Sequence, residues 1–480
     1  MSLRKRAING MLWTFFQQFS VQGVSFIVSL FLARLLLPSE FGLIAMITVF
    51  IGLGNTLINS GLSQSLLRTK NPDNDDFSTI FYFNVTVSVF VYVLIFFLSP
   101  LIALFFQQKV LTSILRVYCI TFIINSFSSI QIIRFTLKNN FKTQALISIP
   151  SVIISSLIGI ILAYFHFGVW SLIWSAIIQS IISTIQYWFI GKWKPEATFN
   201  REKIIKHWRF GNKLLLSGLL DNIFTNIYTI FIGKYFSPSQ AGYFQRADSL
   251  KQFPVSNISV IVSKVSYPLL SSIQDDDLRL KIVYKKILQT VVFFVTPILI
   301  ILAVLAKPLI VVFYTSKWIS IVPYFQILCF SGILYPIHVY NLDLLNIKGR
   351  SDLFLKLEII KTIIIILIIV ISLNWGINGL LISTIFSSVF SLYANSYYTS
   401  KLIDYNFFNQ LFDLFPIFLI SIFTGLFLIY IDKYFIFFEI NNYIRIISEG
   451  LLGIIIYLIF SFLFKLETFN DLKTTLLVND

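Results

Sequence analysis

The feature that most constrains this chain is a series of long apolar runs that recurs from one end to the other. Each run is close to the roughly 20 residues that a helix needs to cross the hydrocarbon of a bilayer. Only 12% of the 480 residues are charged, about half of the roughly 25% typical of soluble domains. The chain is therefore expected to be an integral membrane protein with about fourteen spans. The expected spans are 9–34, 41–66, 78–106, 110–133, 145–165, 168–191, 210–233, 253–273, 287–306, 320–346, 353–373, 376–400, 411–431 and 443–464.

Helices are the expected spanning elements. Lipid offers a backbone no hydrogen-bonding partner, so each span must satisfy its own backbone groups, and the alternation typical of barrel strands is missing. The first apolar run follows Arg4-Lys5-Arg6 but is too long for the core of a signal peptide and lacks a small-residue cleavage site. We interpret it as the first span. The predicted fold class is an all-α integral membrane protein.

The distribution of basic residues predicts the orientation. If the N-terminus is placed inside and the spans alternate, roughly 23 Lys and Arg residues fall in inside segments and about eight in outside segments. This bias predicts that both termini are cytoplasmic. It also accounts for the net charge of +15 without a nucleic-acid partner.

The longest basic loop, 192–209, follows the sixth span and predicts a division into three parts. These are an N-terminal lobe at 1–195, a C-terminal lobe at 196–402, and two further spans with a cytoplasmic tail at 403–480. A short echo supports two related halves, because Pro38 to Gly42 follows the first span and the similar Pro238 to Gly242 follows the seventh. With six spans each, the halves would share one orientation and be related by an axis along the membrane normal.

Several kinds of site are not expected. Cys119 and Cys329 both lie in apolar runs and read as small buried hydrophobes, and the three histidines are far apart in sequence, which argues against a metal site. The chain has no P-loop and no hydrolase or metalloprotease motif. We therefore expect neither a cofactor nor an enzymatic activity.

Polar side chains inside the spans are the candidate functional residues, because burying them in hydrocarbon is costly. Lys264 lies near the centre of the eighth span, with Asn257 seven residues earlier on the same helix face. Asp221 lies in the seventh span beside Asn222, ahead of Asn226. Lys264 is expected to line a polar lumen, to snorkel, or to pair with a carboxylate, for which Asp221 is the candidate. Such a pair would be structural, or would hold Lys264 until an anion competes.

The first two spans carry polar stripes spaced by about one helical turn. The stripes either line a hydrated cavity or form hydrogen bonds between helices. Arg116 in the fourth span is a similar candidate, or snorkels from a helix end. Arg246 and Lys251 are placed in an outer loop, 234–252, where charged side chains are usually solvated, but Arg246 is also a candidate for binding substrate in the cavity. The stripes consist of Gln18, Gln22, Ser25 and Ser29 in the first span and Asn55, Asn59 and Ser63 in the second.

Several segments along the chain carry a family resemblance. They are 38–46, which leads into 61–66, then 210–211, 232–247 and 267–276. In these segments the chain resembles the polysaccharide-export flippases of the multidrug/oligosaccharidyl-lipid/polysaccharide exporter superfamily. Within that superfamily it is most similar to translocases of lipopolysaccharide, O-antigen and exopolysaccharide biosynthesis.

The resemblance implies two six-helix lobes around a central cavity, plus two C-terminal helices, in the bacterial cytoplasmic (inner) membrane. The implied substrate is an oligosaccharide linked to undecaprenyl diphosphate, which the protein would flip to the periplasmic leaflet by alternating access. Other polysaccharide assembly proteins are candidate partners. No catalytic residue is carried over from the family.

Two other functions compete with the flippase. A cation-coupled multidrug-type exporter would share the fold, but it should have buried carboxylates, and the first six spans show no clear acid at mid-membrane depth. Lys264 would also repel a cationic drug. A membrane glycan polymerase or ligase would need a larger outer loop than any expected here.

Overall fold

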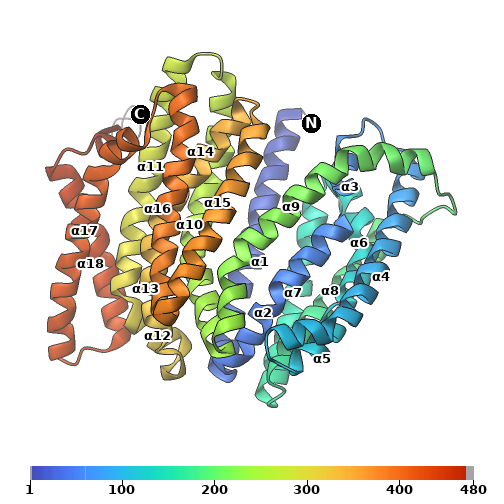
Figure 1. Cartoon of the computed structure of the whole chain (residues 1–480), viewed down its shortest axis with the longest axis horizontal. Helices are drawn as coiled ribbons and strands as arrows, with labels where there is room; N and C mark the ends of the chain where they lie inside the picture. The colour runs from blue at the N-terminus through green and yellow to red at the C-terminus, as the bar shows by residue number, and fades with distance from the viewer. Residues whose placement is uncertain (1–2, 60, 472–480) are drawn as a thin grey trace. The chain divides into compact units, whose positions relative to one another are not determined.

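The computed structural model describes residues 3–59 and 61–471, without the side chains of residues 3–12, 213, 260, 261, 264, 265, 351 and 355. Within that part the secondary structure is helical throughout, with α-helices, two short 3-10 helices and no strand (Figure 1). The prediction of an all-α protein is confirmed.

The chain divides into two compact units, Met1–Gly242 and Tyr243–Asp480. The lobe boundaries expected from the sequence remain a prediction. Unit 1 contains α1 (Leu3–Leu35), α2 (Pro38–Asn59), α3 (Leu62–Arg68), α4 (Asn74–Phe105), α5 (Val110–Tyr118), α6 (Ile120–Leu137), α7 (Phe141–Tyr164), α8 (Val169–Gly191), α9 (Arg201–Tyr235) and the first turn of α10 (Pro238–Ser272). Unit 2 contains the rest of α10, α11 (Asp277–Val304), α12 (Ala306–Tyr314), η1 (Ser316–Trp318), α13 (Ile321–Ile333), α14 (Tyr335–Ile347), α15 (Ser351–Ser372), η2 (Leu373–Trp375), α16 (Gly376–Ile403), α17 (Phe407–Phe437) and α18 (Asn442–Leu463).

Eleven helical segments of the described chain are long and apolar enough to cross a membrane. Two of them, Val110–Leu137 and Ile321–Ile347, each consist of two consecutive helices. The remaining expected spans coincide with α10, α15 and α16, which are 35, 22 and 28 residues long. Eleven and these three make fourteen, in agreement with the predicted number.

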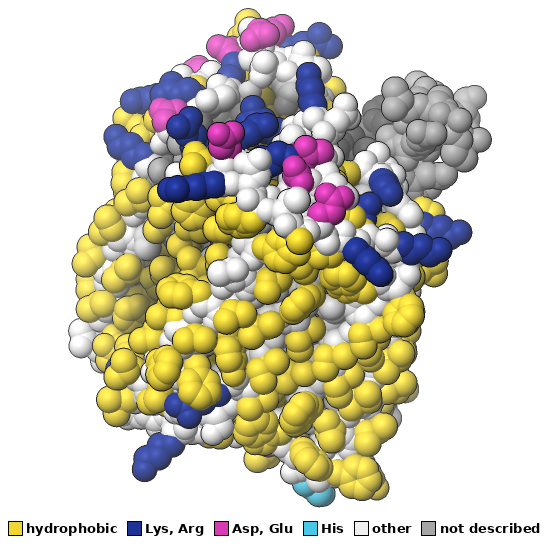
Figure 2. All heavy atoms as spheres, turned by 90° about the vertical axis from the view of Figure 1, so that its right-hand side faces the viewer, with side chains coloured by type: hydrophobic (Ala, Val, Ile, Leu, Met, Phe, Trp, Pro, Cys, Tyr) yellow, Lys and Arg dark blue, Asp and Glu magenta, His cyan; other side chains and the backbone are white. Residues whose placement is uncertain are grey.

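The surface of the molecule also has the character of a membrane protein. Figure 2 shows a face with a broad band of hydrophobic side chains, above which most of the charged side chains gather. Largely exposed aromatic and aliphatic residues are common on the spans, such as Phe97 at 72% and Leu104 at 73% exposure. Side chains of this kind belong in hydrocarbon.

The sequence places polar caps where the helices begin. Asp73 and Asp76 form a reciprocal capping box at the start of α4, and Asn200 accepts hydrogen bonds from the first turn of α9. Asp276 and Asn406 cap α11 and α17 in the same way. These side chains satisfy backbone N–H groups that a helix cannot satisfy itself.

The prediction of an outer loop at 234–252 is wrong. α10 begins at Pro238, because proline is suited to a first helical position and the Gln240 side chain accepts a hydrogen bond from Ser237 N at 3.1 Å. Lys251 is buried within the helix and pairs with Asp248 at 2.6 Å. Charged residues close together suggest a solvated loop, but Asp248 and Lys251 neutralise each other one helical turn apart.

Candidate functional site

The first candidate feature is the contact between α2 and α9 in unit 1. Glycines allow the two helices to approach closely: a Cβ on Gly52 would overlap the Asn222 amide, and a Cβ on Gly218 would touch Thr56. The Asn222 side-chain oxygen is buried and accepts no hydrogen bond from any described residue. A buried hydrogen-bond acceptor without a donor destabilises a protein. Helix packing alone therefore does not explain why an amide side chain lies at this contact.

Other predicted polar residues lie on the same two helices. Asn55 and Asn59 of α2 and Asp221 of α9 are exposed, whereas Asn226 is half-buried and donates its amide to the backbone oxygen of Asn222 at 2.9 Å. At 1.5 Å per residue, Asn55 lies about 26 Å along α2 from Pro38, and Asp221 about 21 Å along α9 from Tyr235. We call these five residues (Asn55, Asn59, Asp221, Asn222 and Asn226) the α2/α9 polar face.

Gln18 and Gln22 lie half-buried on α1, a helix that packs along α7. Their neighbour Gln17 is used structurally, since its side chain donates to Ser148 Oγ on α7 at 2.9 Å. Gln17 lies beside the polar stripe of the first span and is not part of it, so both interpretations of the stripe remain predictions.

Arg116 lies elsewhere in unit 1 and has a structural explanation. Pro100 has no N–H, so the Phe96 carbonyl in α4 lacks its usual helical donor. Arg116 Nε lies 3.4 Å from that carbonyl and 3.2 Å from Ser99 Oγ, and its guanidinium lies over the Phe96 ring. Arg116 therefore supplies a hydrogen-bond donor to the carbonyl that Pro100 leaves without one.

The candidates of unit 2 lie on α10. Asn257 donates to the Phe253 carbonyl at 2.7 Å, and Arg246 is half-buried. The Lys264 side chain lies outside the described part of the structure, so its predicted pairing with Asp221 remains a prediction.

A buried ion pair on α15 was not expected from the sequence. Lys361 of α15 is 5% exposed and pairs with Glu358 at 2.5 Å. The sequence does contain a sign of this pair. An acid and a base lie three residues apart inside an apolar run, and residues at that spacing share one helix face. Packed nearby on α14, His338 is held by a hydrogen bond of 3.0 Å to Ser388.

The repeated turns predicted from the sequence meet in unit 1. A Cβ on Gly42 would overlap the Pro238 carbonyl, and a Cβ on Gly242 would overlap the Pro38 carbonyl. The turns are also capped alike, since Glu40 accepts from Leu37 N at 2.7 Å and Gln240 accepts from Ser237 N at 3.1 Å. The relation is reciprocal, as expected of two copies of one motif related by a two-fold axis. We call it the glycine crossing.

An ionic cluster ties the other end of α9 to α3 and α4. Lys203 Nζ lies 2.6 Å from Asp73 Oδ2, and the buried His207 contacts Asp76 at 3.5 Å and Ser65 Oγ at 2.8 Å. Hydrogen bonding to Lys203 holds the pKa of Asp73 at about 2. Burial lowers the pKa of His207 despite the nearby Asp76 carboxylate. At neutral pH the cluster therefore contains a neutral imidazole and the ionised Asp73 carboxylate.

Comparison with known proteins gives a consistent picture. A family model described as "Polysaccharide biosynthesis protein" matches residues 31–323. The lipopolysaccharide biosynthesis protein WzxC of Escherichia coli (strain K12) is 26% identical over 377 residues, which cover 77% of this chain and 76% of WzxC. The succinoglycan biosynthesis transport protein ExoT of Rhizobium meliloti (strain 1021) is 21% identical over 343 residues, covering 71% of this chain and 69% of ExoT.

The fold is similar to a solved structure with the description "Lipid II flippase MurJ, inward closed conformation". The TM-score is 0.74 at 18% identity, and the match covers 95% of this chain and 98% of the other. At this identity the likeness concerns the arrangement of helices. It agrees with the predicted all-α membrane architecture.

Proposed function

Because this chain belongs to the family of polysaccharide biosynthesis proteins, we propose that it is a flippase for a lipid-linked oligosaccharide. The substrate would carry undecaprenyl diphosphate, and the protein would move it across the bacterial cytoplasmic membrane for lipopolysaccharide, O-antigen or exopolysaccharide biosynthesis. It would act as a transporter and not as an enzyme. Both termini would lie in the cytoplasm, as the positions of the basic residues predict.

The α2/α9 polar face is the observation that carries the proposal. Asn55 and Asp221 are exposed inside helices that are long and apolar enough to span a membrane, and the exposed Asn59 is the last residue of α2. Exposure of such groups to hydrocarbon would cost several kcal/mol each. Exposure to a hydrated passage would cost nothing and would give the glycan hydroxyls both donors and acceptors.

A charged headgroup also needs a cation along its path. Lys264 is the proposed contact for the diphosphate, with Asn257 seven residues away on the same helix. The polyprenyl chain would remain in lipid, so that only the phosphates and sugars enter the passage.

Alternating access requires contacts that close the passage on one side of the membrane and that can break to open it. The glycine crossing and the ionic cluster lie near opposite ends of α9, and each depends on contacts that a helix movement would break. We propose them as the two closures of unit 1. Rocking of repeated halves about a central site is the usual form of such transport.

A cation-coupled drug exporter is the second candidate on this fold. Asp221 is the exposed acid that would have to bind the coupling ion. Drug resistance conferred by overexpression and abolished by Asp221→Asn would favour the exporter over the flippase.

The direct test is reconstitution. The purified protein in liposomes should move a fluorescent lipid-linked oligosaccharide between leaflets faster than protein-free liposomes. The double variant Asn55→Leu/Asn59→Leu should lose at least tenfold of this rate. Thr86→Leu, which removes an exposed hydroxyl from α4, should keep it. No exchange by folded wild-type protein would refute the proposal.

A further inference from the structure

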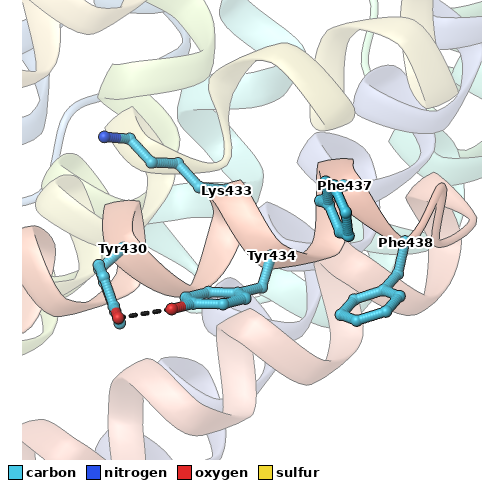
Figure 3. Close-up of a pocket in the computed structure, with 5 residues that line it drawn as sticks. All are labelled: Tyr430, Lys433, Tyr434, Phe437 and Phe438. Atoms are coloured by element: carbon cyan, nitrogen blue, oxygen red, sulfur yellow. Dashed lines mark hydrogen bonds between the residues drawn. The ribbon is translucent and has the colours of Figure 1, made fainter.

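The turn between α17 and α18 carries a hollow that the proposed function does not use. It has a volume of about 430 Å³ and is lined by Tyr430, Lys433, Tyr434, Phe437 and Phe438. All five come from the last turns of α17 and the residue that follows it (Figure 3). In the described structure α17 and α18 pack as a hairpin, with α17 also against α11.

Lys433 supplies an unneutralised positive charge at this hollow. It is exposed, and no described carboxylate lies within ion-pairing distance of it. The adjacent acid, Asp432, is bound by the buried Arg445 of α18. Glu449, which is also buried, lies 3.7 Å from the same arginine. The nearby carboxylates on both helices are thus directed to Arg445, and the exposed Glu439 lies beyond the helix end.

The tyrosines supply a hydrogen-bond donor. The hydroxyls of Tyr430 and Tyr434 lie 2.6 Å apart, as Figure 3 shows. In such a pair one hydroxyl donates to the other, and the second keeps its own proton for an outside acceptor. Both rings are about half exposed, so an acceptor outside the protein can reach them.

The rest of α17 supplies an apolar track. Exposed aromatic and aliphatic residues continue along the helix away from the turn, among them Phe415, Phe423 and Leu426, each more than half exposed. A cation and a hydroxyl near a helix end, above a track of this kind, match a molecule with a phosphate head and long acyl chains. Aromatic residues with basic neighbours near a span end are typical of the bilayer interface.

We propose that this hollow is a binding site for an anionic phospholipid of the bilayer. The phosphate binds between the tyrosine pair and Lys433, whose exposed side chain turns toward it from the direction drawn in Figure 3, and an acyl chain follows α17. A zwitterionic lipid fits less well, because its own ammonium competes for the phosphate and is repelled by the lysine. The lipid site does not involve the glycan substrate. Its test is therefore independent of the test of the flippase proposal.

The test measures lipids that remain bound to the full-length protein after purification from equimolar phosphatidylglycerol and phosphatidylethanolamine, by native mass spectrometry. The wild type should retain phosphatidylglycerol preferentially. Lys433→Gln should reduce this retention about fivefold, as expected for one interfacial lysine, and Tyr434→Phe should reduce it less. Both residues are exposed, so both variants should keep the unfolding temperature of the wild type.

Lys307→Gln is the matched control, since Lys307 is an exposed lysine of α12. Equal losses in Lys433→Gln and Lys307→Gln would show unspecific attraction to the surface and overturn the site. Unchanged retention in Lys433→Gln would also overturn it. Displacement of phosphatidylglycerol by an equimolar amount of undecaprenyl phosphate would assign the hollow to the carrier lipid instead.

Discussion

At the scale of single residues, the contact between Gly52 and Asn222 decides how closely α2 and α9 approach. Glycine is required because any Cβ there would overlap the amide. We expect Gly52→Ala to destabilise the protein by about 1–3 kcal/mol, the usual cost of overpacking. It should also lower transport, because the helices must separate. Thermal unfolding in detergent measures the first effect and the liposome assay the second.

Gly23→Ala on α1 is the control, because a Cβ there meets nothing within 4 Å. The double variant Gly52→Ala/Asn222→Ala removes the amide that causes the overlap and should recover most of the lost stability. Equal destabilisation by the double and single variants would show that Gly52 matters for another reason.

His207 gives the ionic cluster a pH dependence. Its pKa in the folded protein lies below the 6.5 of an exposed histidine, because burial disfavours the charged ring. The unfolded chain therefore binds more protons just below pH 6.5, and stability should fall as the pH drops through that value. Lys203 and Lys206 oppose protonation and Asp76 favours it.

The measurement is the unfolding temperature between pH 5 and pH 8. We expect the wild type to lose stability below about pH 6.5 and His207→Asn to lose less over the same range. Asp73 does not interfere, because its pKa of about 2 confines its contribution to the range below its ordinary value of 3.8. A steeper loss in the variant would contradict the assignment.

The sequence identifies polar residues inside the spans more readily than it predicts their roles. Asn55 and Asp221 stood out because amides and acids are rare in apolar runs. Arg116 looked the same, but its role depends on a carbonyl freed by Pro100, which lies 16 residues away in sequence and on another helix. Contacts of that kind follow from tertiary packing and not from spacing.

At the scale of elements, prolines inside helices recur, and two of the carbonyls they free accept hydrogen bonds from side chains. Pro297 leaves the Phe293 carbonyl of α11 without a helical donor, and Tyr457 of α18 donates its hydroxyl to it at 3.0 Å. Arg116 and Ser99 do the same for Phe96 in α4. A membrane protein needs such substitutes because lipid has none to offer.

Tyr457→Phe should therefore cost about 1–3 kcal/mol of stability, the penalty of an unsatisfied buried acceptor. In a Pro297→Ala background the restored N–H can serve Phe293, and the same change should cost less. The coupling between the two changes is measured by chemical unfolding of four proteins: the wild type, Tyr457→Phe, Pro297→Ala and the double variant. Tyr164→Phe, at a tyrosine 69% exposed, should be neutral in both backgrounds, and a coupling of zero would contradict the explanation.

The sequence predicted most elements because the apolar runs are long. It failed at α10, where charged residues suggested a loop although they pair within the helix. The repeated Pro–Ser turns were visible in the sequence, but their reciprocal contact was not, because two similar motifs can be far apart in space.

At the scale of the whole molecule, the eleven candidate spans of the described chain, three further long helices and the family membership agree on a membrane transporter. The central claim is that the α2/α9 polar face borders water and receives the sugar and phosphate groups of the substrate. It requires that two exposed side chains on different helices face different media, one water and the other lipid. Asn55 would face a wet passage, whereas Phe97 on α4 would face lipid.

Cysteine accessibility tests this claim most directly. The native thiols, Cys119 and Cys329, are buried, so a single introduced cysteine can be followed with a membrane-impermeant maleimide in reconstituted protein. We expect Asn55→Cys to react at least tenfold faster than Phe97→Cys, and the lipid-linked oligosaccharide to slow this reaction. Equal reactivity at the two positions, or no reaction at Asn55→Cys from either side of the membrane, would contradict the account.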